Sequence, residues 1–340
     1  MVVDDPNGVR HAADHLFASS AVRLLMSNVE LTVVIPVKDE EVAVGPCLDR
    51  LIPVLQGLTD PASKSFEILF VDDGSEDRTL EVIRKANAAD PRIRAISLSR
   101  NFGKEAALSA GLDVARGLAV VPLDVDLQDP PEALPKMLEQ WRSGFDVVYG
   151  VRDNRESDSL PKRLTADLYY RAHNWLSDDK IPEHAGDFRL LDRKVVEVIR
   201  QMPERNRFMK GLFAWAGFKQ AAVLYHREER KVGKTKFNYW KLWTLAIDGI
   251  TSASTLPLRV WSYLGALVAL GALAYSVYII IVTLTSGIDV PGYASLMVAV
   301  LFLGGLQLLS LGVLGEYVGR ILTETKGRPL YVVRETIGGD

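Results

Sequence analysis

Two aspartates one residue apart, Asp124 and Asp126, have the spacing that most directly suggests chemistry in this chain of 340 residues. They end an apolar run, LAVVPLD (118–124), and precede the Asp-Pro-Pro of 129–131. Two carboxylates at the end of a strand can both reach a hard divalent cation, and the Gln128 carbonyl can add a third oxygen. Mg²⁺ is often held by one or two carboxylates together with substrate phosphates. The motif therefore predicts a cation site for a phosphate-bearing substrate.

Polar clusters also follow two earlier apolar runs, KDEE at 38–41 and DDGS at 72–75. Apolar runs that alternate with helix-like segments predict an α/β fold with a doubly wound, mainly parallel sheet. Ligands bind such sheets at the carboxyl ends of the strands, so we expect the polar clusters to meet at one edge. The expected strands are 31–37, 66–72, 93–99, 118–124 and 145–150, and the expected helices are 40–56, 77–89, 103–116 and 131–142.

Several other classes of site lack their sequence pattern. There is no GxxxxGK[ST] loop, no GxGxxG after the first expected strand, no HExxH and no GxSxG. The net charge of −3, from 40 basic and 43 acidic residues, gives no electrostatic case for binding nucleic acid, and we expect none. The single cysteine, Cys47, can form neither an internal disulfide nor a cysteine-based zinc site.

Two long segments near the C-terminus, 260–284 and 294–315, carry no charged residue. As helices each covers about 33–38 Å, which is enough to cross a bilayer core of about 30 Å. The connecting residues 285–293 contain no Lys or Arg, whereas both flanks are basic, so the chain on both sides is expected in the cytoplasm. A pair of buried core helices is the alternative, but such helices rarely avoid charge for so long.

Two further segments bear on the relation to the membrane. The stretch 237–254 mixes aromatic residues with few charges and is either a helix lying on the inner leaflet or an amphipathic helix packed on the globular part. Residues 1–30 contain early acidic residues and no long apolar core, so no signal peptide is expected.

The order of the motifs resembles the family 2 glycosyltransferases with a GT-A fold. Within them it is similar to the polyprenyl-phosphate glycosyltransferases, the group of dolichol-phosphate mannose synthases and bacterial bactoprenol glucosyltransferases. Departures are Asp39, where Asn is usual, and Val125, where Ala is usual; residues 1–30 have no counterpart. The matching stretches are VVIPVKDEE (33–41), VDDGSEDRT (71–79), SRNFGKEAALSAGL (99–112), DVDLQDPPE (124–132), YGVRD (149–153), GDFRLLDR (186–193), ERKVGKTKFNYWKL (229–242) and ETKGRPLYVV (324–333).

The resemblance implies roles for individual residues. Mg²⁺ or Mn²⁺ on the donor diphosphate would be held by Asp124, Asp126 and Gln128. The nucleotide sugar would contact Pro36, Glu40, Val71, Asp73, Asp124 and Val125. The implied catalytic residues are Asp126, Arg152 and Asp187, the last as a base or as a group that orients the phosphate or an arginine. The acceptor phosphate would be bound by Arg152, Arg163, Arg189, Arg230, Lys234 and Lys236.

Each role has a plainer alternative. Asp72 and Asp73 can instead cap the helix that follows Ser75. A lysine in the basic run, such as Lys234, can contact anionic headgroups, and Asp187 can pair with Arg189. Lys104 and Glu105, at the start of the expected helix 103–116, are interpreted as structural and outside the site.

The function implied is the inverting transfer of one hexose from a nucleotide sugar, with UDP-glucose as the leading donor, to undecaprenyl phosphate. The reaction would occur at the cytoplasmic face of a bacterial inner membrane. Other donors stay open: GDP-mannose with a dolichol-type lipid, a UDP-N-acetylhexosamine or a modified pentose. A processive synthase would need more spans and a QxxRW-type motif, a degenerate scaffold would have lost the aspartate pair, and a transporter would need more intramembrane polar residues than Gln307.

The expected organisation has five parts. Small residues in the spans permit close helix packing, so a homo-oligomer is expected. The parts are an N-terminal extension (1–30), a cytoplasmic GT-A catalytic domain (31–236), an interfacial helix (237–257), a two-helix transmembrane hairpin (258–318) and a cytoplasmic tail (319–340).

Overall fold

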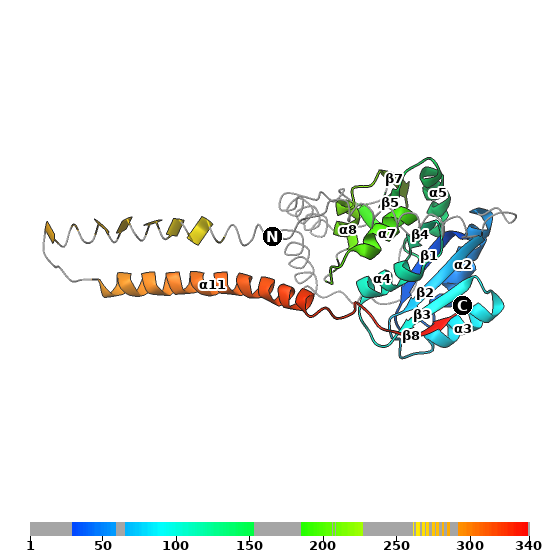
Figure 1. Ribbon diagram of the computed structural model, residues 1–340, viewed down its shortest axis with the longest axis horizontal. Coiled ribbons are helices and arrows are strands. Elements are labelled where there is room, and N and C mark those ends of the chain that lie inside the picture. Colours follow the sequence, from blue (N-terminus) through cyan, green and yellow to red (C-terminus); the bar gives the residue numbers. More distant parts are fainter. Residues whose placement is uncertain are drawn as a thin grey trace, which may run out of the picture.

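The computed structural model describes residues 29–58, 65–152, 185–205, 207, 209–226, parts of 261–285, and 292–338. Most of the N-terminal extension and the whole expected interfacial helix 237–257 lie outside these residues. The described chain forms an α/β domain from which one long helix projects (Figure 1).

The described strands form one eight-stranded sheet in the order β7-β5-β6-β4-β1-β2-β3-β8. β1 pairs in parallel with β2 and β4, β2 with β3, and β5 with β7, whereas β6 and β8 run antiparallel to their neighbours. The prediction of a mainly parallel α/β sheet is confirmed. The strands are β1 (Val29–Val37), β2 (Ser65–Asp72), β3 (Ile93–Leu98), β4 (Ala119–Pro122), β5 (Val147–Arg152), β6 (Ala185–Asp192), β7 (Gln220–Tyr225) and β8 (Val333–Ile337).

Helices cover both faces of the sheet, as a doubly wound fold requires. One buried apolar cluster joins the sheet to α2, α3 and α5, and a second joins its other face to α4, α7 and α8. Strand β1 supplies both clusters because successive side chains point to opposite faces. The helices are α2 (Val44–Leu58), α3 (Thr79–Ala89), α4 (Lys104–Val114), the 3₁₀ turn η1 (Pro131–Ala133), α5 (Leu134–Arg142), α7 (Arg193–Gln201), α8 (Met209–Trp215) and α11 (Tyr293–Thr325).

Helix α4 packs unusually close to the sheet at Gly111. A side-chain carbon at this position would lie 2.3 Å from Cγ1 of Val34 in β1 and 3.0 Å from Cγ2 of Val71 in β2. Glycine is therefore required for α4 to approach the central strands. This contact fixes the helix whose first residue is Lys104.

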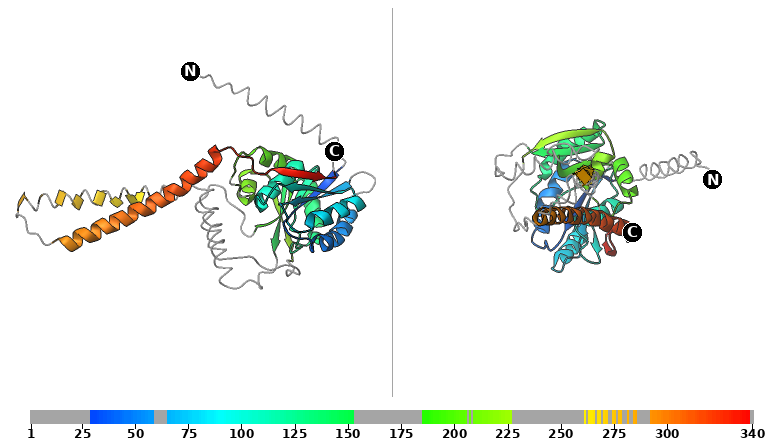
Figure 2. Two further views of the ribbon diagram at one scale, coloured as in Figure 1. Left: turned by 90° about the horizontal axis from the view of Figure 1, so that it is seen from below. Right: turned by 90° about the vertical axis from the view of Figure 1, so that its left-hand side faces the viewer.

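Helix α11 extends away from the α/β domain, and the described residues between 261 and 285 are helical and run alongside it (Figures 1 and 2). Among the described residues one stretch, Phe302–Thr325, is long and apolar enough to cross a membrane. It overlaps the second of the two expected spans. Large apolar side chains such as Phe302, Leu308 and Leu311 are exposed along α11 in the isolated chain.

The chain returns to the sheet after α11. The Ser99 amide donates to the Val332 carbonyl at 2.8 Å, and β8 then pairs with β3 as an edge strand. Arg84 of α3 forms an ion pair of 2.6 Å with Glu335. The C-terminal tail is thus built into the globular domain and ties the end of the apolar helix to the edge of the sheet.

Candidate active site

The Asp124–Asp126 pair lies where β4 ends, in the loop that leads to η1. Leu127 adopts a φ of 51°, and its amide donates to the Asp124 carbonyl at 3.2 Å, so the chain turns sharply between the two motif aspartates and Gln128. The Gln128 amide donates to the Asp126 carboxylate at 3.2 Å. Asp126 also faces α2, where it adds to burial in raising the pKa of the Cys47 thiol to about 12.

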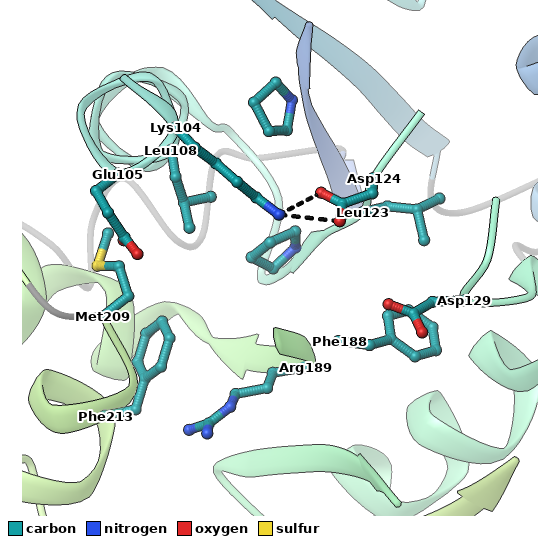
Figure 3. A pocket seen from close by; sticks show the side chains of 12 residues that line it. Lys104, Glu105, Leu108, Leu123, Asp124, Asp129, Phe188, Arg189, Met209 and Phe213 are labelled. Carbon is teal, nitrogen blue, oxygen red and sulfur yellow. Dashed lines mark hydrogen bonds and ion pairs between the residues drawn. The ribbon is translucent and has the colours of Figure 1, made fainter. Parts of the chain in front are cut away.

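Lys104 reaches across from the first turn of α4 to Asp124 (Figure 3). Its Nζ lies 2.7 Å from one carboxylate oxygen of Asp124 and 2.9 Å from the other. Lys104 and Glu105, interpreted from the sequence as structural and outside the site, both line the same pocket as Asp124. The motif aspartate is therefore neutralised by a residue 20 positions earlier in the chain.

The pocket around this ion pair is lined by both charged and apolar side chains. Its remaining walls come from β1, β4, β6, α8 and the loop after β4, and Pro36, which the resemblance assigns to the nucleotide sugar, is among them. The lining residues are Pro36, Lys104, Glu105, Leu108, Pro122, Leu123, Asp124, Asp129, Phe188, Arg189, Met209 and Phe213.

Asp73 holds the loop that precedes α4. Its two carboxylate oxygens accept hydrogen bonds from the Phe102 amide at 2.7 Å and the Gly103 amide at 2.9 Å. Gly103 has a φ of 99°, a conformation that favours glycine. The alternative in which Asp73 caps the next helix is wrong, since α3 has no side-chain cap and Asp73 is bonded elsewhere. Asp73 instead fixes the backbone from which Lys104 projects.

Asp72 is fully buried next to Asp73 and connects three parts of the chain. It accepts hydrogen bonds from the Ser75 amide at 3.0 Å and from the Ser97 hydroxyl at 2.7 Å. Arg334 of β8 lies 3.9 Å from the same carboxylate. The C-terminal strand therefore reaches the loop of the DDGS motif.

Asp39, which departs from the usual Asn, joins the first two polar clusters. It adopts a φ of 54°, which Asn and Asp tolerate better than most residues. Its carboxylate accepts a 2.9 Å hydrogen bond from the Glu76 amide, and this bond, with Lys38 beside it, lowers the pKa of the carboxyl. Glu40 lies next to it, with its amide donating to the Thr79 hydroxyl at 2.8 Å. Asp39 thus acts as a hydrogen-bond acceptor, which needs only a carboxylate oxygen and not the amide donor of Asn.

Asp129 and Arg152 are linked through Tyr225, a residue that the sequence interpretation missed. The buried Tyr225 hydroxyl donates to Asp129 at 2.5 Å. Burial and Asp129 raise the pKa of Tyr225, while a hydrogen bond from Arg152 opposes them. Arg152 and Tyr225 are also paired in the register of β5 and β7. The link brings a predicted catalytic arginine into one network with the last aspartate of the motif.

Arg189 lies fully buried in β6, with its guanidinium carbon 5.1 Å from the centre of the Phe213 ring. In Figure 3 the guanidinium points toward Phe213 and away from Asp124. Asp187 lies two residues earlier in β6, but its side chain is outside the described part of the structure.

The remaining predicted residues divide into two groups. Val71 and Val125 are buried in the two apolar clusters on opposite faces of the sheet. The predicted acceptor-phosphate residues outside the described part of the chain are Arg163, Arg230, Lys234 and Lys236.

Comparisons with known proteins bear on this pocket and on the apolar helix. Residues 32–200 match the model of glycosyl transferase family 2, and residues 256–321 match that of the GtrB C-terminal hairpin. The match to this hairpin, together with the exposed apolar helix, indicates association with a membrane.

Relatives extend over nearly the whole chain. An uncharacterized glycosyltransferase of Synechocystis sp. is 52% identical over 92% of this chain and 96% of its own length. A prophage bactoprenol glucosyl transferase homolog of Escherichia coli is 48% identical over 90% of this chain and 98% of its own length. An SfII prophage-derived bactoprenol glucosyl transferase of Shigella flexneri is 48% identical over 92% of this chain and 99% of its own length. The chain therefore belongs to glycosyl transferase family 2, in the group that contains these bactoprenol glucosyl transferases.

Proposed function

We propose that this enzyme transfers one glucose from UDP-glucose to undecaprenyl phosphate at the cytoplasmic face of a bacterial inner membrane, with inversion at the anomeric carbon. The observation that carries the proposal is the pocket at the end of β4, where Asp124 meets Lys104 in a lining that also contains apolar side chains. The identity of about half to bactoprenol glucosyl transferases, along nearly the whole chain, supports glucose and a bactoprenol lipid as substrates.

A divalent cation fits the donor groups at this strand end. Asp124, Asp126 and Gln128 offer carboxylate and amide oxygens, which Mg²⁺ and Mn²⁺ prefer. Within the described part of the chain no group of three Asp, Glu, His or Cys side chains is assembled to hold a metal. The remaining ligands of the cation would come from the donor diphosphate. When bound, it would stabilise charge on the leaving nucleoside diphosphate.

The acceptor determines what else the protein must supply. A lipid phosphate monoester is largely dianionic at pH 7, because its second pKa is about 6, and it is already a nucleophile. The protein therefore needs cations that bring this phosphate close to an anionic donor, rather than a strong base. Arg152, held by Tyr225, is the cation that we assign nearest to the reacting groups.

The other predicted acceptor-phosphate residues are Arg163, Arg189, Arg230, Lys234 and Lys236, with Asp187 orienting the phosphate or one of these arginines. Arg189 can serve only from the wall of the pocket, since its guanidinium is buried over Phe213. We assign the nucleotide to the edge formed by Pro36, Glu40, Val71, Asp73 and Val125. Val71 and Val125 would contribute through their backbone, because their side chains are buried in the core.

The membrane segments hold the pocket at the lipid surface. We propose that the two spans form a hairpin (258–318), that the interfacial helix (237–257) lies on the inner leaflet, and that the enzyme is a homo-oligomer. The hairpin match and the exposed apolar surface of α11 support this arrangement.

The test is a panel of labelled donors offered to membranes that contain the full chain. We expect UDP-glucose, with undecaprenyl phosphate and Mg²⁺ or Mn²⁺, to give lipid-linked label, and GDP-mannose and UDP-N-acetylglucosamine to give little. If one of these other donors gives lipid-linked label instead, the assignment of glucose is wrong and the assignment of a lipid-phosphate acceptor stands. No metal-dependent lipid-linked label from any donor would refute the proposed function.

A further inference from the structure

The ammonium of Lys104 occupies the carboxylate that the proposed cation needs. Its Nζ is within 2.9 Å of both oxygens of Asp124. The ammonium opposes a metal ion at those oxygens, because it takes up acceptor sites on both of them and repels a second cation a few ångströms away. Lys104 and a divalent cation therefore compete for Asp124.

The Lys104 side chain can move away from Asp124 while the backbone at the start of α4 stays in place. Asp73 holds the amides of Phe102 and Gly103, and the Ala107 amide bonds back to the Gly103 carbonyl, so the start of α4 is fixed. The lysine and aspartate side chains are 52% and 42% exposed. Exposed ion pairs are weak, and lysine is a point charge on a flexible stem.

We propose that Lys104 is a displaceable counter-ion of Asp124 that makes divalent-metal binding depend on the nucleotide diphosphate. This inference rests on the proposed function, which assigns the metal and the donor diphosphate to this strand end. Without nucleotide, Lys104 neutralises Asp124 and resists the metal. A diphosphate entering the pocket offers Lys104 another anionic partner, so Asp124 is released to the cation.

This exchange couples the two ligands. Each makes the site more favourable for the other, and the coupling must be reciprocal: UDP strengthens Mn²⁺ binding by the same factor by which Mn²⁺ strengthens UDP binding. Asp124 also keeps a cationic partner in both states: Lys104 without the nucleotide, and the divalent cation with it.

The experiment measures Mn²⁺ affinity by electron paramagnetic resonance on the detergent-solubilised full chain, with and without UDP. For the unmodified protein we expect weak binding of Mn²⁺ alone and much tighter binding with UDP. Lys104→Met should bind Mn²⁺ alone about three- to tenfold more tightly, since both a competitor and a repelling charge are removed. The factor by which UDP tightens Mn²⁺ binding should be smaller in the same variant.

Two control variants make the result specific. Lys85→Met removes an exposed lysine of α3 and should leave both affinities unchanged. If Lys104→Met has the Mn²⁺ affinity and UDP dependence of the unmodified protein, the counter-ion inference is overturned and the metal site is not. If Asp124→Asn also binds Mn²⁺ unchanged, the metal assignment in the proposed function fails as well. A thermal melt of each variant checks that it is folded.

Discussion

The two motif aspartates have different surroundings. Asp124 faces the pocket and Lys104, whereas Asp126 accepts the Gln128 amide and faces the buried thiol of Cys47. The pair is therefore not a symmetric clamp before ligands bind. Asp124 exchanges partners, and Asp126 keeps the turn around Leu127 in place.

Replacing Asp126 with Ala tests the role of the second carboxylate of the pair. We expect transfer activity to fall at least a hundredfold, because a cation ligand and the bond that holds the Gln128 amide are both lost. Initial rates at saturating donor and metal measure this. Asp49→Ala, on the exposed side of α2, is the control and should keep normal rates. Full activity of Asp126→Ala would contradict the metal assignment.

The Tyr225 phenol predicts an alkaline limit to stability. Its folded-state pKa is raised by burial and by Asp129, so the folded protein keeps this proton where an unfolded chain, with a pKa of about 10, loses it. The contribution is complete below about pH 10 and is lost as the pH rises further. The melting temperature should therefore decrease as the pH rises above about 10. This decrease should be less steep in Tyr225→Phe than in the control Tyr149→Phe. Equal slopes in the two variants would contradict this explanation.

The sequence predicts residues of the site only where they are close together in the chain. Asp124 and Asp126 are found from their spacing and from the apolar run before them. Lys104 and Tyr225 are missed because they lie 20 and 96 residues from their partners, and only the fold brings them together. A lysine at a helix start and a tyrosine at a strand end have many ordinary structural uses, so neither residue carries a local signal.

At the scale of elements, α4 is the part that positions the site. It is fixed at its start by Asp73 and in its middle by Gly111 against Val34 and Val71. Because Lys104 is its first residue, a shift of α4 away from the sheet would move the ammonium from Asp124.

Gly111→Ala should lower the free energy of unfolding by about 1–3 kcal/mol, since the added carbon overlaps the stiff Val34 side chain. It should also weaken donor binding through Lys104. Gly57→Ala in α2 is the matched control: nothing lies within 4 Å of the added carbon, and alanine is the better helix former. Thermal melts of both variants measure the loss of stability. An equal loss in the two variants would contradict the close packing of α4 against the sheet.

The strands β1 to β5 are predicted from sequence, whereas β6, β7 and β8 are not. The expected strands at 31–37, 66–72 and 93–99 are buried on both faces and read as continuous apolar runs. Strand β6 contains Asp187 and Arg189, and β8 reads VRETI, with alternating exposure at the edge of the sheet. Such strands form because they pair with distant parts of the chain, and the local sequence pattern does not indicate this pairing.

At the scale of the whole molecule, the apolar helix α11 is attached to the α/β domain at its C-terminal end, whereas its N-terminal end lies far from that domain (Figure 1). α11 ends at Thr325, and within eight residues the chain begins β8, which pairs with β3. Arg334 then reaches Ser97 at 2.9 Å, beside Asp72. The membrane segment and the DDGS loop are thus mechanically connected through one edge strand.

Ending the chain after Arg328 removes β8 but leaves the apolar helix complete. We expect a clearly lower melting midpoint and self-association, because the edge of β3 is exposed and can pair with other chains. Size-exclusion chromatography and thermal melts measure these effects. Glu335→Gln removes the partly exposed ion pairs of this carboxylate with Arg84 and Arg334 and should change the midpoint little. A truncated protein as stable as the full chain would show that β8 does not support the sheet.

Glucose transfer by the purified full chain tests the central claim most directly. The reaction contains UDP-glucose labelled in the sugar, undecaprenyl phosphate in detergent and Mn²⁺, and label extracted with the lipid is counted. We expect label to accumulate with the unmodified protein, to disappear when the metal is chelated, and to be absent with folded Asp126→Ala. No lipid-linked label from the folded, unmodified protein would contradict the assignment of this pocket to glucosyl transfer onto a lipid phosphate.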